Sequence, residues 1–498
     1  MKNNVKIIRY LITGLFLIAM GCEKLEETPK SSLTSGTFYK TKDDLWASTV
    51  AIFNILGGGA NWNGFSTVQG YSTFYGGDDV ITRNDLVGVQ NKGFGRDFDE
   101  FRASSSSEGV IFLWQTCFGT IRQSNEVLEN YEKVENCPEL DRNQCAAIAH
   151  FTRAFAYFML VQTYGGVPIF ATNPTSNTFP KRDAVKDVYN FIVEDLQFAE
   201  NYLPVEWPGE PGKPTVGACK SLLSKVYLTM AGWPLKQSEY YLLAAQKASE
   251  VINSGDYDLM PAFADFFKLA NNNCKESIFA LQYSVALGFG NHVSGMSSQP
   301  SDESGWDDFY AELAFYKRFP AGPRKLATFY DTINVSGMRV PYMMGNTKHP
   351  YYRKFRDGGI DESDPASLST YDTDRTMPFI RFADILLVYA EAKSMANGSP
   401  TESCYWAINR VRNRAGLQNL TPALNATAFR DSVVQERAWE LAGEWQRWFD
   451  MVRLEIVEEV SLQRDPEEIP TFPVTKESYL CPIPQSEINL NPNLLLNP

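Results

Sequence analysis

The sequence predicts a mainly α-helical protein in which helical hairpins form a scaffold, with an irregular, loop-rich face and a few short strands. Three observations support this prediction. Residues 145–163 are apolar on nearly every side of a helix, as in a helix buried by other elements. Further segments with helical periodicity precede and follow it. Two regions, 57–109 and 276–375, are rich in glycine, aromatic and acidic residues and largely lack that period.

The bulk composition is that of a globular protein with a large core. The chain has 498 residues, of which 44% are hydrophobic and 21% charged. Its net charge of −13 repels the phosphate backbone of nucleic acids, and no long basic cluster offsets that charge. We therefore expect no nucleic-acid partner. Apart from Cys22, the cysteines are seven in number and scattered, which does not indicate a disulfide framework.

The N-terminus has the pattern of an export signal. Residues 11–20 are apolar but too few to span a membrane, and they follow a positively charged start. Small residues then stand directly before Cys22, which resembles a bacterial lipoprotein cleavage site. The resemblance implies removal of residues 1–21 and lipidation of Cys22, and more than one acyl chain would make the anchor stable. An ordinary signal peptide with a coincidental cysteine is the alternative. Residues 22–40 are polar and are predicted to form a tether.

The helices of the first part follow in order along the chain. One is predicted at 41–56, before the loop region 57–109. Residues 110–133 are expected to pack beside 143–164, which ends at Gly165-Gly166 and Pro168. Another helix is predicted at 183–203 and a pair within 217–253. We assign this first part to residues 41–275.

The second part, 276–498, begins with the loop-rich region 276–375 and continues as helices over 376–458 and a terminal coil. Within the loops, 277–287 is rich in β-forming residues and is predicted to contain short strands. A helical pair is predicted at 380–416, and such pairs resemble tetratricopeptide hairpins. One long helix is predicted at 427–457 from an apolar stripe at spacings of 3 and 4, formed by Val434, Ala438, Leu441, Trp445, Trp448 and Val452.

Several short motifs occur together, in order, along nearly the whole chain. They include Arg153-Ala154 and Tyr164-Gly165-Gly166-Val167-Pro168, then Asn409-Arg410-Val411-Arg412-Asn413-Arg414-Ala415-Gly416, and finally Pro482-Ile483-Pro484. Jointly they resemble the SusD/RagB family of surface nutrient-binding lipoproteins. The resemblance implies four tetratricopeptide-like hairpins that support a less regular ligand face. It also implies docking as a lid on a TonB-dependent (SusC-like) outer-membrane transporter. Acidic residues soon after the lipidated cysteine resemble the family's signal for the outer face of the membrane (Glu23, Glu26 and Glu27).

Patterns typical of catalysis are absent from the sequence. Three histidines occur, and their spacing matches no zinc motif (His150, His292 and His349). No phosphate-binding loop, nucleophile elbow or dinucleotide fingerprint is present. We therefore predict no enzyme activity, no metal site and no cofactor. Acidic pairs such as Asp302-Glu303 and Asp307-Asp308 are interpreted as solvated loops, although a glycosidase would need two carboxylates at a set separation. The charges of the last helix are interpreted as ion pairs along it (Glu436, Arg437, Glu440, Glu444, Arg447 and Asp450).

The aromatic loops hold the candidate ligand-binding residues. Sugars present apolar C–H faces that stack on aromatic rings, while their hydroxyl groups need amide, carboxylate or guanidinium partners. Both kinds of group occur in the two irregular regions, at Asn61, Trp62, Tyr71, Tyr75, Asp78, Trp306 and Tyr310. The alternative is that these rings anchor the loops on the helices. Trp445 and Trp448 are predicted to lie in the core.

The sequence thus indicates a lipid-anchored outer-membrane protein, facing the cell exterior, that binds a glycan and delivers it to a transporter. Three alternatives remain open at this point. The ligand could be a peptide or glycoprotein, the protein could be a surface glycoside hydrolase, or it could be a scaffold that binds only proteins.

Overall fold

The computed structural model describes residues 38–58, 64–66, 71, 73–82, 93–176, 179–356 and 372–495. These residues form a mainly helical molecule with short strands, which confirms the predicted fold class. Within this described part, none of the helices combines the length and apolarity needed to cross a bilayer. The main hydrophobic core contains residues from Leu56 to Leu494, so both halves of the chain contribute to it.

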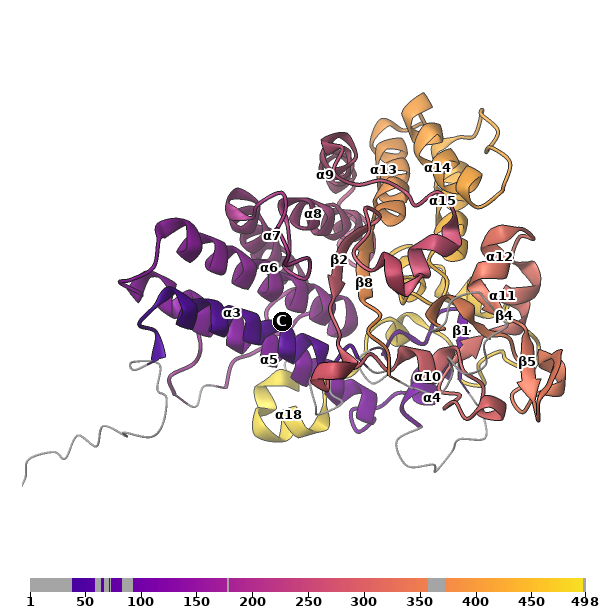
Figure 1. Cartoon of the computed structure of the whole chain (residues 1–498), viewed down its shortest axis with the longest axis horizontal. Coiled ribbons are helices and arrows are strands. Elements are labelled where there is room, and N and C mark those ends of the chain that lie inside the picture. Colours follow the sequence, from indigo (N-terminus) through magenta and orange to yellow (C-terminus); the bar gives the residue numbers. More distant parts are fainter. Residues whose placement is uncertain are drawn as a thin grey trace, which may run out of the picture.

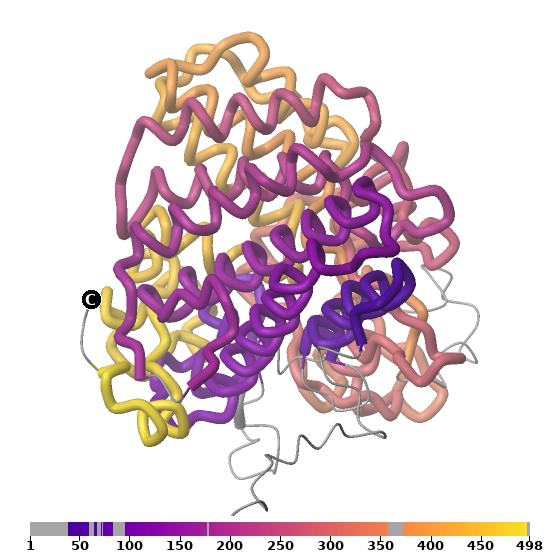
Figure 2. Tube along the Cα trace, turned by 90° about the vertical axis from the view of Figure 1, so that its left-hand side faces the viewer, coloured from indigo at the N-terminus to yellow at the C-terminus, as the bar shows by residue number. Residues whose placement is uncertain are grey.

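Among the described residues, nine helices, each packed on its neighbours, form the scaffold (Figures 1 and 2). Contacts connect α3 with α5 and α6, and then α5 through α9 in succession. From α9 the series continues to α13, which packs on both α14 and α15. The bounds are α3 Lys42–Gly57, α5 Glu108–Asn130, α6 Glu139–Tyr164, α7 Val185–Tyr202, α8 Val216–Met230, α9 Tyr240–Ser254, α13 Phe382–Asn397, α14 Glu402–Arg414 and α15 Ala426–Glu440. The helical pairs predicted from the sequence are therefore confirmed.

Helix α6 lies at the centre of the first half, as its all-round apolar sequence predicts. It contacts α3, α5, α7 and α8, and Phe151 and Phe155 are almost completely buried. The helix ends at Gly165, whose φ of 73° is a left-handed conformation. A Cβ atom at this position would lie 2.9 Å from a methyl carbon of Leu480. Glycine is therefore required where the chain leaves α6 and passes under the C-terminal segment.

Most of the short elements lie at the right in Figure 1, whereas β2 and β8 lie in the middle and α18 lies below α5. In the part of the chain that the structure describes, four antiparallel two-stranded sheets pair β1 with β3, β2 with β8, β4 with β7 and β5 with β6. The strands are β1 Val80–Ile81, β2 Ser277–Leu281, β3 Tyr310–Ala311, β4 Phe329–Tyr330, β5 Thr332–Val335, β6 Met338–Pro341, β7 Tyr351–Tyr352 and β8 Met377–Arg381. The short helices are α4 Gly93–Asp99, α10 Val293–Ser297, α11 Leu313–Arg318, α12 Pro323–Thr328, α16 Arg447–Arg453, α17 Val457–Ser461 and α18 Gln485–Leu490.

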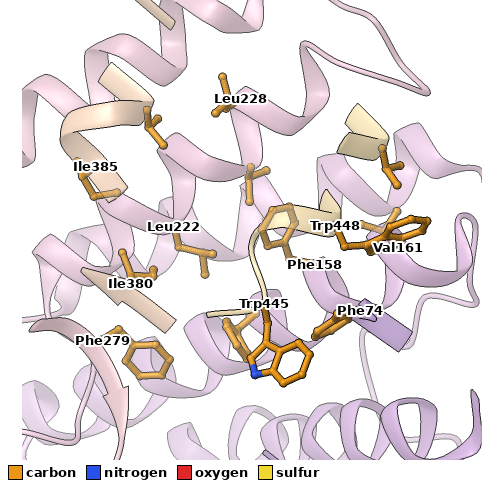
Figure 3. Close-up of a cluster of buried hydrophobic side chains, with 14 of the residues drawn as sticks. Phe74, Phe158, Val161, Leu222, Leu228, Phe279, Ile380, Ile385, Trp445 and Trp448 are labelled. Carbon is orange, nitrogen blue, oxygen red and sulfur yellow. The ribbon is translucent and has the colours of Figure 1, made fainter. Parts of the chain in front are cut away.

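The prediction of one long helix over 427–457 is wrong. Helix α15 ends at Glu440, and a turn with left-handed φ values at Gly443 (72°) and Trp445 (62°) separates it from α16. A Cβ atom on Gly443 would lie 2.7 Å from the ring of Tyr352, so the turn passes too close to that ring for any other residue. The turn directs Trp445 into the core, where its ring stacks on that of Tyr71, in the same buried cluster as Phe74 (Figure 3). The predicted burial of Trp445 and Trp448 is confirmed, at 5% and 6% exposure.

Glu436, Arg437 and Glu440 of α15 are buried and pair with residues of other elements, which corrects the prediction of ion pairs along one helix. Arg381, at the end of β8, donates from Nη1 to Glu440 (2.6 Å) and from Nε to Glu444 (2.8 Å). Arg324 of α12 donates to the other carboxylate oxygen of Glu440 (2.9 Å). Burial alone would raise the pKa of Glu440, but the guanidinium groups of Arg414, Arg381 and Arg324 outweigh it and lower that pKa well below its usual range.

A pair of acidic residues fixes the first loop region to the turn after α15. Asp78 accepts a hydrogen bond from Nε of Arg447 (2.6 Å), and Asp79 accepts one from the amide of Gly443 (2.7 Å). The Tyr352 hydroxyl donates to the carbonyl oxygen of Asp79. Burial raises the pKa of Asp79 from 3.8 to about 6, although the Gly443 amide opposes this shift. The loop is therefore held by contacts with residues more than 250 positions away.

Replacing Arg381 with alanine should destabilise the protein by about 3–5 kcal/mol, because the carboxylates of Glu440 and Glu444 would lose a buried counter-charge. Urea unfolding monitored by circular dichroism measures this change. Arg430→Ala is the matched control, because its partner Asp431 has a side chain that is 61% exposed. That pair should contribute about 1 kcal/mol or less. An equal decrease in the free energy of unfolding of the two variants would contradict the importance that we assign to the buried network.

Replacing Asp79 with asparagine should alter how stability depends on pH. The folded state binds the Asp79 proton more tightly than the unfolded state does. The stabilisation that the proton gives to the folded state is therefore complete at low pH and is lost as the pH rises through about 6. The free energy of unfolding of the natural protein, minus that of the variant, should fall by up to about 3 kcal/mol between about pH 4 and about pH 7. A difference that stays constant over this range would show that Asp79 does not titrate in this way.

Candidate functional site

The structure distributes the candidate ligand-binding residues between the interior and one partly exposed position. Asn61 and Trp62 lie outside the described residues. Of the other five, Trp306 is partly exposed, and the rest are buried (Tyr71, Tyr75, Asp78 and Tyr310).

Tyr71 and Tyr75 pack against the turn after α15. The Tyr71 ring is stacked on Trp445, with 5.0 Å between centroids and 9° between planes, and its hydroxyl donates to the carbonyl of Phe65 (3.1 Å). Tyr75 also contacts Trp445 and is fully buried. Burial raises the pKa of both phenols well above the usual value. This placement corresponds to the alternative in which the rings anchor the loop, because neither ring offers a free face to a ligand.

Asp78 and Tyr310 are likewise occupied by protein partners. Asp78 is paired with Arg447, and Tyr310 lies in β3, where it is paired with Ile81 of β1. The Tyr310 ring lies 4.5 Å from the imidazole of His349, measured between centroids. The interpretation of Asp307-Asp308 as a solvated loop is wrong, since these residues are 0% and 8% exposed.

Trp306 lies where three distant segments meet. Its amide donates to the carbonyl of Gly295 in α10 (2.9 Å), and its ring lies 6.0 Å from the imidazole of His292. The His292 amide donates to the carbonyl of Ser66 (3.1 Å), and the amide of Asn291 donates to the carbonyl of Thr373 (2.9 Å). Segments 64–66, 291–306 and 372–373 are thereby held together. We call this surface the Trp306 face.

Titratable groups accompany the indole on the Trp306 face. Nδ1 of His292 lies against the carboxylate of Asp372, whose side chain is 44% exposed. Burial lowers the pKa of His292, and the Asp372 carboxylate opposes that shift. The face therefore combines a half-buried aromatic ring with an imidazole and a carboxylate. Such a set can stack on an apolar surface and exchange hydrogen bonds with hydroxyl groups.

Sequence reasoning missed His292 and Asp372 as members of this face. The two residues are 80 positions apart, and no local spacing connects them. Their association depends on the backbone hydrogen bonds between Asn291 and Thr373, which the sequence pattern does not indicate. Among the residues that the structure describes, no group of histidine, cysteine, aspartate and glutamate side chains is arranged to hold a metal ion.

Comparison with known proteins identifies related chains over nearly the full length. Residues 69–228 match a family model described as "Starch-binding associating with outer membrane", and residues 330–498 match the model of the SusD family. SusD-like protein P2 of Formosa agariphila is 28% identical over 531 residues, which cover 98% of this chain and 99% of that protein.

Solved structures show the same architecture. A SusD superfamily protein from Parabacteroides distasonis is similar with a TM-score of 0.75 and 26% identity, over 94% of this chain and 99% of that one. Surface glycan-binding protein A from Bacteroides thetaiotaomicron, solved in complex with laminarihexaose, is similar with a TM-score of 0.74 and 20% identity, over 90% of this chain and 98% of that one. With two family models that match successive parts of the sequence and full-length relatives of the same kind, the chain belongs to the SusD/RagB family.

Proposed function

We propose that this protein is a non-enzymatic, surface-exposed glycan-binding lipoprotein that delivers oligosaccharide to a TonB-dependent outer-membrane transporter. The observation that carries the proposal is the partly exposed indole of Trp306, held beside His292 and Asp372 where three loop segments meet. The likeness to a glycan-binding protein solved with laminarihexaose supports the choice of a sugar ligand.

The proposed mode of binding follows from the chemistry of the Trp306 face. An apolar C–H face of a sugar residue packs on the indole, while hydroxyl groups donate to the Asp372 carboxylate and exchange hydrogen bonds with His292. Asn61 and Trp62 are proposed as further contacts, because they stand shortly before Gly64 and Ser66 in the sequence and Ser66 is bonded to His292. We do not retain Tyr71, Tyr75, Asp78 or Tyr310 as direct contacts, because all four are buried.

Anchoring and delivery complete the proposal. The N-terminal pattern supports lipidation of Cys22, and residues 22–40 would then separate the folded body from the membrane. The match to a family model described as associating with the outer membrane supports that location. A SusC-like transporter is the proposed recipient of the ligand.

Replacing Trp306 with alanine should weaken glycan binding by roughly tenfold or more, because the variant loses the apolar surface on which the sugar packs. Affinity gel electrophoresis against laminarin, xyloglucan and starch, followed by calorimetry with the polysaccharide that retards the protein, measures the change. Trp406→Ala is the matched control, since Trp406 is a 45% exposed tryptophan on α14, outside the Trp306 face. Retardation by none of these glycans together with binding of peptides, or release of reducing ends by the protein, would contradict the proposal.

Replacing Cys22 with alanine should move the protein from the membrane fraction to the soluble fraction, because the variant has no thiol to acylate. Fractionation of cells followed by immunoblotting measures the distribution. Cys274→Ala, at a half-buried thiol of the folded body, should leave the distribution unchanged. If the Cys22→Ala protein stays with the membranes, Cys22 is not the anchor.

A further inference from the structure

A cleft of about 500 Å³ lies between α15, the segment from α16 to α17, and the end of α11. None of its lining residues belongs to the Trp306 face. We call it the α15 cleft. Its volume is within the range of small-molecule sites, which are concave, largely apolar and supplied with a few polar groups.

The walls of the α15 cleft supply an apolar surface with one indole. Aliphatic and aromatic side chains from three elements line it, namely Phe315, Val434, Leu454, Ile456 and Val460. Trp439 of α15 contacts the main core and remains partly exposed at the cleft. The ring can therefore receive the apolar face of a ligand.

The bottom of the cleft holds a guanidinium group with spare donors. Arg447 is only 6% exposed, and its Nε donates to Asp78 (2.6 Å). No hydrogen bond from its two terminal amino groups to a described residue is present, although Arg447 lines the cleft. Neither amino group is enclosed in the interior, so both are open to the cleft, where a ligand oxygen can accept a hydrogen bond from them. The cleft therefore presents hydrogen-bond donors at its bottom beside an apolar wall.

The remaining polar groups of the cleft balance one another in charge. Arg318 approaches Asp78 with 3.7 Å between Nη2 and Oδ2, and Arg430 is paired with Asp431 (2.8 Å). With Arg447 and Glu459, which also line the cleft, the lining contains three arginines and three carboxylates. Such a lining selects for hydroxyl groups, which both donate and accept, rather than for a strongly charged ligand. The side-chain amides of Gln435 and Gln463 at the rim also both donate and accept hydrogen bonds.

We propose that the α15 cleft is a second saccharide-binding site, which takes a neutral pyranose residue with one face on Trp439 and a hydroxyl oxygen on the terminal amino groups of Arg447. The proposal rests on the proposed glycan-binding function and adds a site on the helical scaffold. Two sites on one chain would hold a polysaccharide that reaches both more tightly than either site alone.

The test uses the full mature chain labelled with 5-fluorotryptophan, titrated with D-glucose, D-galactose, D-xylose and laminarihexaose. Tryptophan-to-phenylalanine variants at positions 306, 406 and 439 assign the fluorine resonances. At least one of the four sugars should produce a saturable shift of the Trp439 resonance, and the resonance of Trp406 should not move. The absence of a saturable Trp439 shift with all four sugars overturns the proposal.

Two sets of variants separate this proposal from that of the Trp306 face. In Trp306→Ala the Trp439 shift should persist, and its loss would overturn the independence of the second site. Arg318→Ala and Gln435→Ala should each weaken sugar binding at Trp439 by roughly threefold to tenfold, whereas Arg410→Ala on α14 should not. A shift at Trp439 without one at Trp306 supports the second site and refutes the proposed role of Trp306. A shift of the Trp306 resonance without one at Trp439 supports the proposed role of Trp306 and refutes the second site. Thermal unfolding of each variant confirms that the fold is kept.

Discussion

The structure depends on a network of buried charges around the end of α15. Glu440 accepts hydrogen bonds from Arg381 of β8 and Arg324 of α12, and Arg414 of α14 also contacts it. One carboxylate thus connects three elements that are far apart in the sequence. Because a buried charge is tolerated only when it is paired, these contacts fix how α12, α14 and β8 are placed around α15. The turn that follows α15 then holds the first loop region through Asp78 and Asp79.

The helical scaffold was the part that sequence reasoning predicted well. A buried helix such as α6 has apolar residues along its length, and glycine and proline mark where it ends. The prediction of one long helix over 427–457 failed for a specific reason. The apolar stripe continues through Trp445, but Trp445 has a φ of 62°, which tryptophan rarely adopts. Gly443 was the one local sign of the turn in the sequence. Glycine is needed there because the ring of Tyr352, about 90 residues away in the sequence, lies too close for a side chain.

The candidate ligand residues were harder to choose from the sequence, because an aromatic residue in a glycine-rich loop is equally suited to stacking on a sugar and to filling a gap in the core. Tyr71 belongs to the second case because Trp445 covers it, whereas Trp306 stays partly exposed and is the residue that we propose for the first. The partners of Trp306 and the members of the α15 cleft come from segments separated by tens to hundreds of residues. Only the folded arrangement of the chain brings these residues together.

We propose that the helical scaffold holds the loops of the Trp306 face in position for a glycan. Hydrogen–deuterium exchange measures this most directly, with and without the polysaccharide that retards the protein in a gel. Binding should slow exchange at amides of 64–66, 291–306 and 372–373 and leave exchange in α6 and α13 unchanged. Protection confined to segments outside the Trp306 face and the α15 cleft, or none at saturating glycan, would contradict it.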